Sequence, residues 1–281
     1  MPLNVSNAPV AIGGIGGSGT RVVAEILRVA GFYMGSDLNE ANDNLWFPLL
    51  FVRRPNWDID DIKFSSLVSI FVTAMTGACP LTETEISLVR DLTAEDRIQH
   101  STTWLKSRAE TLIVNACSGM SPNFWGWKAP NTHIFLDRLP QFISGLKYIH
   151  IARNGLDMAY SKNQNQLRIW GRLVLGGDCA VTARNSLRFW CWAQKRVLDI
   201  GADMKSNFIF VRYEDLCSEP KVTMQRILHF AGIQPDEQLL ARSVALITPS
   251  KSIGRHKCFP LQDFDPLDVA YVRQLGFVVG A

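Results

Sequence analysis

Five glycines and one serine stand between an apolar run and an amphipathic segment near the N-terminus, in AIGGIGGSGTRVVAEILRVAG. Glycine lets the backbone approach an oxyanion closely, and a helix N-terminus directs N–H groups at it. Hydroxyl and guanidinium groups after the glycines add further donors. We therefore expect an anion-binding loop, with a plain strand-to-helix turn as the alternative. Its expected residues are Gly16, Gly17, Ser18, Gly19, Thr20 and Arg21.

This loop departs from the pattern of nucleotide triphosphatases, G-x-x-x-x-G-K-[ST], which requires a lysine directly after its second glycine. When the pattern is started at Gly14, the second glycine falls on Gly19, but Thr20 occupies the lysine position. The sequence therefore disfavours a magnesium-dependent triphosphatase. A P-loop kinase-like phosphotransferase remains an alternative.

Two later segments carry residues that suit a second phosphate. In YIHIARNGLDMAYS, Arg153 ends a strand-like run, and Ser161 follows after two expected turns of helix. In KSIGRHK, cations that include Arg255 and Lys257 flank a glycine. The alternatives are an i,i+4 ion pair of Arg153 with Asp157 and a solvated basic loop.

Two further strand ends carry polar or aromatic side chains. Lys128 ends FWGWK and His133 follows shortly, so we expect both to face one crevice, with His133 as a candidate catalytic base. Tyr213 follows FIFVR and is a candidate to flank a base ring; packing at a sheet edge is the alternative. Six aromatic residues suit either an acceptor pocket or the core: Trp46, Phe47, Trp57, Trp104, Trp125 and Trp127.

Short apolar runs that alternate with helical patterns predict the elements that position these residues. Strands are expected at 10–13, 124–128, 147–152 and 208–212, and helices at 20–30, 132–139, 155–167, 181–203, 221–231 and from 266. This alternation predicts an α/β fold with a mostly parallel sheet covered on both faces. Ligands bind beyond the carboxyl ends of such strands. Residues 1–281 are expected to form a single domain, with a mostly helical insertion at about 40–120.

Composition excludes some classes of function. The 29 Lys and Arg against 26 Asp and Glu leave a net charge of +3, which argues against a general nucleic-acid binder. The six cysteines form no C-x-x-C pair, so we expect buried reduced thiols and no metal site. The N-terminus shows no signal-peptide pattern, and residues 64–79 are shorter than a bilayer crossing. We therefore expect a cytoplasmic protein without a membrane span.

In chain order over about residues 8–260, these segments resemble the sulfotransferases that use 3′-phosphoadenosine 5′-phosphosulfate (PAPS). GGSGTR resembles the family's 5′-phosphosulfate loop, and YIHIARNGLDMAYS resembles its 3′-phosphate motif. FVRYEDL is similar to a further family segment. SIGRHK is similar to the late basic loop, where Arg255 and Lys257 would meet the 3′-phosphate. The resemblance implies a P-loop-like three-layer α/β/α fold, a PAPS donor, no metal, and sulfuryl transfer to a hydroxyl or amine of a small-molecule or carbohydrate acceptor.

The sequence also departs from that family. Gly17 stands where the family usually has a basic residue, so Arg21 or Lys128 is expected to stabilise the leaving oxygen. The adenine-stacking Trp that many members carry after the loop is absent. His133 is the expected base, and its rivals are Asp37, Glu40 and Asp43. A non-catalytic nucleotide-binding protein is the remaining alternative. The oligomeric state is not readable from the sequence.

Overall fold

A sheet of four parallel strands forms the centre of the computed structural model, which describes residues 8–95, 97, 99–177 and 179–280. The strands are β1 (Val10–Gly14), β2 (Gly126–Lys128), β3 (Lys147–Ala152) and β4 (Phe208–Arg212), in the order β2-β1-β3-β4. Gly14 pairs with Ile151, and Ala152 pairs with Arg212, so the carboxyl ends of these strands meet at one edge. The expected α/β class and parallel sheet are confirmed.

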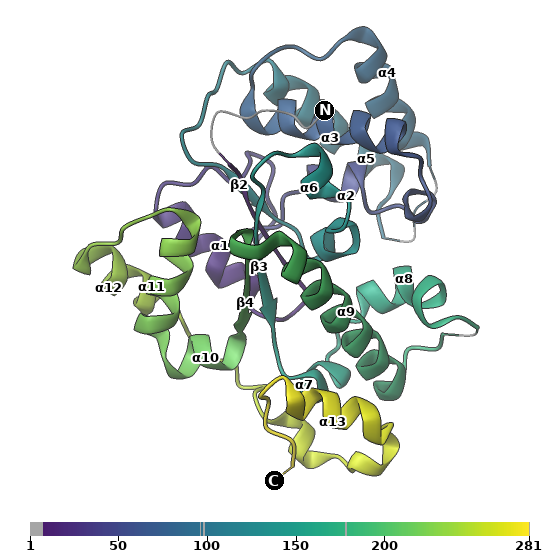
Figure 1. Ribbon diagram of the computed structural model, residues 1–281. Helices are drawn as coiled ribbons and strands as arrows, with labels where there is room; N and C mark the ends of the chain where they lie inside the picture. Colours follow the sequence, from purple (N-terminus) through teal and green to yellow (C-terminus); the bar gives the residue numbers. More distant parts are fainter. Residues whose placement is uncertain (1–7, 96, 98, 178, 281) are drawn as a thin grey trace.

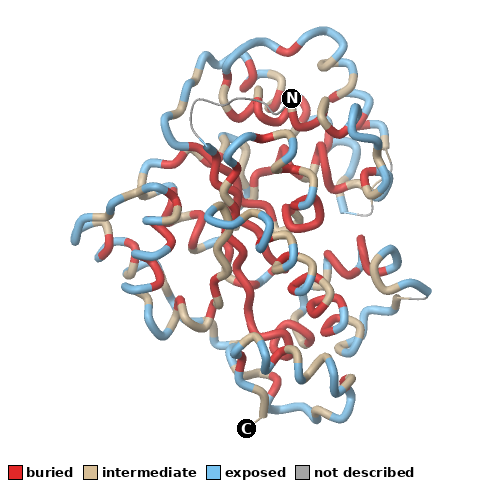
Figure 2. Tube along the Cα trace, viewed as in Figure 1, coloured by how far each residue is buried: buried red, intermediate tan, exposed pale blue. Residues whose placement is uncertain are grey.

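Helices cover both faces of this sheet (Figure 1). Successive side chains of a strand point to opposite faces, so Ile12 and Ile151 pack toward α1 (Thr20–Val29) and α11 (Pro220–Ala231). Ala11 and Tyr148 belong to the other core, which includes α9 (Ala183–Met204). β1, β2 and β3 are accordingly almost continuously buried, whereas β4 at the end of the strand order is mostly half-buried (Figure 2). This packing fixes the sheet edge from which the site residues project.

Between β1 and β2 the chain is mostly helical, as expected. The helices are α2 (Trp46–Leu50), η1 (Arg54–Trp57), α3 (Asp61–Thr76), α4 (Glu83–Asp91), η2 (Leu92–Ala94) and α5 (Thr102–Ala116). Asp60, Thr82 and Ser101 cap α3, α4 and α5 by accepting backbone N–H bonds. Four of the six aromatic candidates belong to the core: Trp46, Phe47, Trp125 and Trp127. That this segment is an insertion in one domain stays a prediction.

Two expected helices are wrong in detail. In place of one helix over 155–167, α7 (Gly155–Ala159) ends early and α8 (Asn165–Leu175) begins anew. The Gln164 carboxamide donates to the carbonyls of Met158 and Ser161, which satisfies backbone groups where α7 stops. In place of a helix over 132–139, a 3₁₀ turn, η3 (Pro130–Phe135), is followed by α6 (Leu139–Phe142).

The C-terminal part matches the expected helices more closely. Its remaining elements are η4 (Lys205–Asn207), α10 (Tyr213–Ser218), α12 (Glu237–Ala245), η5 (Arg255–Cys258), η6 (Leu261–Asp263) and α13 (Pro266–Gln274). The expectation of buried thiols is wrong for Cys79, Cys117 and Cys258, which are exposed. These cysteines stand in or beside turns at the ends of helices. Within the described ranges, no helix combines the length and apolar character that a bilayer crossing requires.

Candidate functional site

The glycine loop joins β1 to α1 at the carboxyl edge of the sheet. Gly17 and Gly19 have φ of 95° and 97°, a backbone region that favours glycine. A Cβ on Gly19 would lie 2.2 Å from the Tyr213 ring, so this position also has no room for a side chain. No side chain of the described residues caps α1 at Gly19. The first N–H groups of α1 are therefore suited to an anion, as the sequence predicts.

Ser18 adds a buried hydroxyl to this loop. Its side chain is 1% exposed, and its Oγ has no hydrogen-bond partner among the described residues. Leaving a buried hydroxyl unpaired costs about 1–3 kcal/mol. A bound acceptor of hydrogen bonds, such as a phosphate or sulfate oxygen, would remove that cost.

Arg153 lies next to the loop, two residues beyond the pairing of Gly14 with Ile151. Its side chain is 4% exposed and its Nη2 donates to Ser252 Oγ at 2.9 Å. The guanidinium carbon lies 5.3 Å from the centroid of the Tyr213 ring, whose edge packs beneath Gly19. The Tyr213 hydroxyl is held by the backbone of Thr248 and Ser250. Tyr213 therefore links Arg153 to the N-terminal turn of α1.

Arg255 joins Arg153 from the first position of η5. Its guanidinium donates to the carbonyls of Tyr160 and Ser252, at 3.1 and 3.3 Å. Burial lowers the pKa of Arg255, the neighbouring charge of Arg153 lowers it further, and the charge of Asp157 raises it. Neither guanidinium forms an ion pair with a carboxylate of the described residues. We call Arg153, Arg255 and Ser252 the guanidinium cluster; its two cations have no ion-pair partner among the described residues, and the charges of Glu214 and Asp157 act on them from a greater distance.

Asp157 of α7 binds the residues on either side of Arg255. Its carboxylate accepts from the backbone N–H groups of Gly254 and His256 at 2.7 and 3.0 Å, and lies 2.7 Å from the His256 ring. The alternative ion pair of Arg153 with Asp157 is therefore wrong, because a tertiary contact takes up this carboxylate. Lys257 is exposed and lines a separate cavity of about 490 Å³.

Ser161 follows α7 rather than ending two turns of helix. Its backbone N–H donates to the Met158 carbonyl, and its Oγ accepts from Asn163. That Oγ lies 3.9 Å from the position of a Cβ on Gly17. The structure thus places Ser161 beside the glycine loop.

Lys128 and Asp43 form a second group of charges. Lys128 is 3% exposed, and its Nζ donates to Asp43 at 2.5 Å and to the Ala41 carbonyl at 3.1 Å. Burial lowers the pKa of Lys128; Asp43 raises it, and the nearby Arg21 lowers it. Arg21 is exposed in the first turn of α1. We call Lys128 and Asp43 the lysine–aspartate pair.

His133 lies apart from this pair. Its side chain is fully buried, with ring centroids 6.3 Å from His150 and 6.5 Å from Trp192. Burial, with the neighbouring His150 and Arg196, lowers the pKa of His133 well below its usual value. The expectation that Lys128 and His133 face one crevice is wrong, because the 3₁₀ turn η3 directs His133 into the core.

The rival acids differ in their surroundings. Asp37 is bound by Arg108 at 2.9 Å and accepts from Thr111, a residue of α5. Glu40 is exposed. Asp43 alone of these three contacts Lys128 among the described residues.

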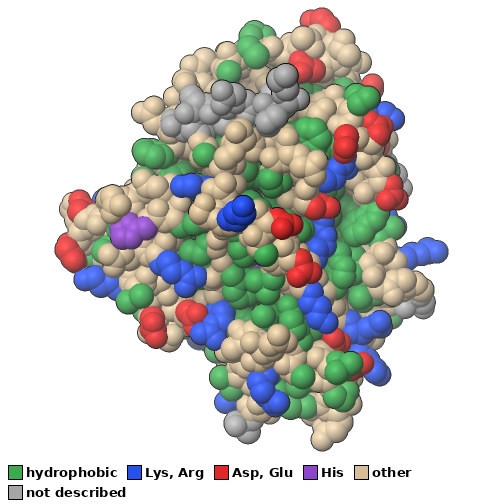
Figure 3. Space-filling view, viewed as in Figure 1, with side chains coloured by type: hydrophobic (Ala, Val, Ile, Leu, Met, Phe, Trp, Pro, Cys, Tyr) green, Lys and Arg blue, Asp and Glu red, His purple; other side chains and the backbone are tan. Residues whose placement is uncertain are grey.

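Sequence reasoning missed Gln166. This residue of α8 is 4% exposed; its amide contacts the backbone N–H of Gly16 at 3.4 Å and the carbonyl of Gly14 at 3.3 Å. It braces the glycine loop from 150 residues away, and no spacing in the sequence signals that contact. Basic and acidic side chains are interspersed on the face in Figure 3, so neither kind of charge forms one broad surface there.

Comparisons with known proteins place these residues in a family. The family described as "Sulfotransferase family" matches residues 9–237. The sulfotransferase domain from the curacin biosynthetic pathway is 15% identical, covers 98% of this chain and 100% of its own, and has a TM-score of 0.53. The sulfotransferase domain of the Synechococcus PCC 7002 olefin synthase is 16% identical, covers 98% of this chain and 96% of its own, and has a TM-score of 0.49. No curated protein matches in sequence. The curacin likeness shows a common fold, and the match over residues 9–237 shows that this chain belongs to the sulfotransferase family.

Proposed function

We propose that this sulfotransferase transfers the sulfuryl group of PAPS to a hydroxyl or amine of a small-molecule or carbohydrate acceptor. The guanidinium cluster is the observation that carries this proposal. Arg153, which is buried, and Arg255, which is half-buried, form no ion pair with a described carboxylate, and Tyr213 links Arg153 to the uncapped N-terminus of α1. A donor with a 5′-phosphosulfate and a 3′-phosphate presents anions to both places, whereas ATP carries no 3′-phosphate.

The residues of the site fit such a donor. The unpaired Oγ of Ser18 and the unpaired Nε of Arg153 are buried donors that an anion would satisfy. We propose that Gly16, Gly17, Gly19, Thr20 and the N–H groups of α1 hold the 5′ end. In this proposal Arg153 and Arg255 hold the 3′-phosphate, supported by Ser161 and Tyr213, while Lys257, which lines the separate cavity, takes no part.

PAPS supplies an activated sulfuryl group on its phosphosulfate bridge. In the proposed reaction, Asp43 takes the proton of the acceptor hydroxyl, and the acceptor oxygen bonds to sulfur in line with the bond that breaks. The bridging oxygen leaves with the electrons of that bond on the 5′-phosphate. Lys128 and Arg21 stabilise its negative charge, in place of the basic residue that the family usually has at the position of Gly17. Asp43 replaces His133 as the proposed base because an acceptor does not reach a fully buried ring.

Calorimetry with adenosine 3′,5′-bisphosphate in the presence of EDTA tests the donor site. The proposal predicts binding without magnesium and much weaker binding of ATP. A preference for magnesium ATP would favour a kinase-like phosphotransferase and contradict the proposal.

Transfer of labelled sulfate from PAPS to a panel of phenols, alcohols, amines and sugars tests catalysis. Binding of the bisphosphate with no labelled product across the panel would favour a non-catalytic nucleotide-binding protein. A cytoplasmic location remains part of the proposal, and fractionation of cells that express the protein tests it.

A further inference from the structure

Asn42 directly precedes Asp43, the proposed base, and has an unusual backbone conformation. Its φ is 60°, in the left-handed region, which asparagine enters more readily than most residues. Lys205, with φ of 52°, is the other non-glycine residue with a positive φ in the part of the chain that the structure describes. Lys205 is exposed, whereas Asn42 is 8% exposed. Such a conformation persists where surrounding contacts fix it, so the contacts of Asn42 are informative.

The contacts of the Asn42 side chain come from α1, the helix that follows the glycine loop. Its Nδ2 donates to Glu25 at 2.9 Å, and its Oδ1 accepts from Arg28 at 3.2 Å. Glu25 and Arg28 also pair with each other at 3.0 Å, so the three side chains contact one another in a closed set. We call Asn42, Glu25 and Arg28 the Asn42 cluster. It attaches the segment before α2 to the helix whose N-terminus is proposed to bind the 5′ end of the donor.

The turn at Asn42 presents two oxygens to Lys128. The Nζ of Lys128 donates to the Ala41 carbonyl at 3.1 Å and to Asp43 Oδ1 at 2.5 Å. Ala41 and Asp43 flank Asn42, so its backbone conformation sets the direction of both groups. Asn39 adds a second set of bonds. Its Oδ1 accepts from the backbone N–H groups of Ala41 and Asp43, and its Nδ2 donates to Asp43 Oδ2, each at 2.9 Å.

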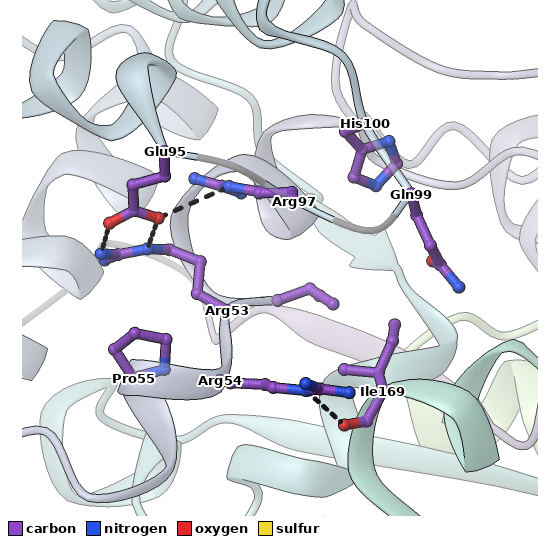
Figure 4. Close-up of a pocket in the computed structure, with 9 residues that line it drawn as sticks. Arg53, Arg54, Pro55, Glu95, Arg97, Gln99, His100 and Ile169 are labelled. Carbon is purple, nitrogen blue, oxygen red and sulfur yellow. Dashed lines mark hydrogen bonds and ion pairs between the residues drawn. The ribbon is translucent and has the colours of Figure 1, made fainter.

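The surroundings of Asp43 differ from those of a carboxylate held between two cations. Glu95 is an example of the latter, because it pairs with both Arg53 and Arg97 (Figure 4). Among the described residues, Asp43 pairs with one cation, Lys128, and its other oxygen accepts from the neutral amide of Asn39. A neutral donor orients a carboxylate but binds its charge less strongly than a second cation does. The position of the Asp43 carboxylate therefore depends strongly on the turn that carries it.

We propose that Asn42 is a positioning residue for sulfuryl transfer: the Asn42 cluster fixes the turn that places the carboxylate of Asp43 beside Lys128 for proton transfer from the acceptor. The inference rests on the proposed function, in which Asp43 is the base. A base acts only within hydrogen-bond reach of the proton, and a misplacement of about 1 Å costs about 100-fold in rate. Since α1 carries both this cluster and the N-terminal turn for the donor, one helix aligns the base with the donor.

Asn42→Gly tests this inference, because glycine keeps the positive φ and removes both side-chain bonds to α1. We expect single-turnover transfer of labelled sulfate from PAPS to an acceptor from the panel to slow about tenfold. The affinity for adenosine 3′,5′-bisphosphate should stay unchanged, which also shows that the variant is folded. Lys205→Gly, the same kind of substitution at the other positive φ, is the matched control and should transfer normally.

A double substitution distinguishes positioning from a general structural role. A positioning residue acts through the group that it positions, so Asn42→Gly should slow transfer no further in an Asp43→Asn background. Losses that multiply in the double variant overturn the inference. A rate for Asn42→Gly within a factor of two of the unmodified protein also overturns it.

Glu25 provides an independent test from the other side of the cluster, which applies even if Asn42→Gly does not fold. Glu25→Ala removes the acceptor of the Asn42 amide, whereas Glu25→Gln keeps an oxygen at that place. Transfer should slow in the first variant and be restored in the second; equal rates overturn the inference. Normal transfer by Asp43→Asn would instead remove the proposed base and this inference together. Failure of the unmodified protein to bind the bisphosphate or to sulfate any acceptor would overturn the proposed function.

Discussion

The guanidinium cluster and the lysine–aspartate pair lie beside the same glycine loop but compensate their charges differently. Arg153 and Arg255 contact hydroxyl and carbonyl oxygens, and no described carboxylate pairs with them. Lys128 is bound directly by Asp43. A buried cation without a countercharge is costly unless an anion binds there. The first group is therefore built for a ligand's negative charge, and the second already holds a proton acceptor beside a cation.

This difference predicts that one group serves donor binding and the other serves the transfer reaction. Changes to the guanidinium cluster should weaken donor affinity, whereas changes to the lysine–aspartate pair should lower the rate of transfer at unchanged donor affinity. Interactions made only in the transition state appear in the rate alone.

The largest expected effect is that of Asp43→Asn. Removing the base should lower sulfuryl transfer about 10²–10⁴-fold, while the affinity for adenosine 3′,5′-bisphosphate stays unchanged. Single-turnover transfer of labelled sulfate to an acceptor from the panel measures this rate. Glu40→Gln, a neighbouring exposed acid, is the control and should transfer normally. A rate within a factor of two of the unmodified protein would remove Asp43 from the mechanism.

Gly19→Ala should damage the loop on which both groups rest. Its φ of 97° costs a non-glycine residue about 1–2 kcal/mol, and the approach to Tyr213 adds overpacking of about 1–3 kcal/mol. Gly31→Ala is a matched control, with φ of 93° and no atom within 4 Å of the added Cβ. Urea unfolding should show a larger loss for Gly19→Ala, and only that variant should weaken bisphosphate binding. Equal losses would mean that Tyr213 adapts without cost.

Asp157→Asn tests whether the guanidinium cluster depends on the contact that holds Arg255. An amide accepts fewer of the N–H bonds from Gly254 and His256, so bisphosphate affinity should fall about tenfold, as for the loss of one charged hydrogen bond. The affinity for adenosine 5′-monophosphate, which has no 3′-phosphate, should change less. Asp236→Asn, at the N-cap of α12, is the control and should bind both ligands normally. An equal fall for both nucleotides would assign Asp157 a general structural role.

The last of these effects concerns the stability of the fold as a function of pH. Burial lowers the pKa of His150 from 6.5 to about 4, so the unfolded chain takes up a proton there before the folded chain does. Stability from this group is complete above about pH 6.5 and is lost as the pH falls toward 4, by about 3 kcal/mol. Urea unfolding between pH 7 and 4.5 should show a shallower loss for His150→Gln. Parallel curves would mean that His150 is not buried as a neutral ring.

The sequence predicted the strands better than the contacts between elements. Residues 147–152 and 208–212 form strands at the expected bounds, because both are mostly apolar runs, as strands of a parallel sheet are. The break between α7 and α8 depends on the amide of Gln164. The position of His133 depends on a turn that begins at Pro130. Local sequence patterns do not reveal where a helix breaks or which way a turn directs a side chain when a more distant contact decides it.

The same limit applies to the site. The glycine loop and Arg153 were predictable, since each follows directly from a strand end. An ion pair of Asp157 with Arg153, four residues before it, was the alternative interpretation, but the partners of Asp157 come from a segment about 100 residues away. No motif or spacing in the sequence indicated the contact of Gln166 with the glycine loop. Residues that contact the ligand can be recognised in part from local sequence. The residues that position them are brought close only by tertiary contacts.

Arg153→Gln tests the central claim most directly: a buried guanidinium beside the glycine loop, with no ion-pair partner among the described residues, binds a second phosphate of the donor. Calorimetry compares adenosine 3′,5′-bisphosphate with adenosine 5′-monophosphate in the unmodified protein and in the variant. We predict that the variant loses about 100-fold in bisphosphate affinity, and much less for the monophosphate, since two or more charged hydrogen bonds disappear. Equal losses for both nucleotides, or no loss for either, would contradict the account.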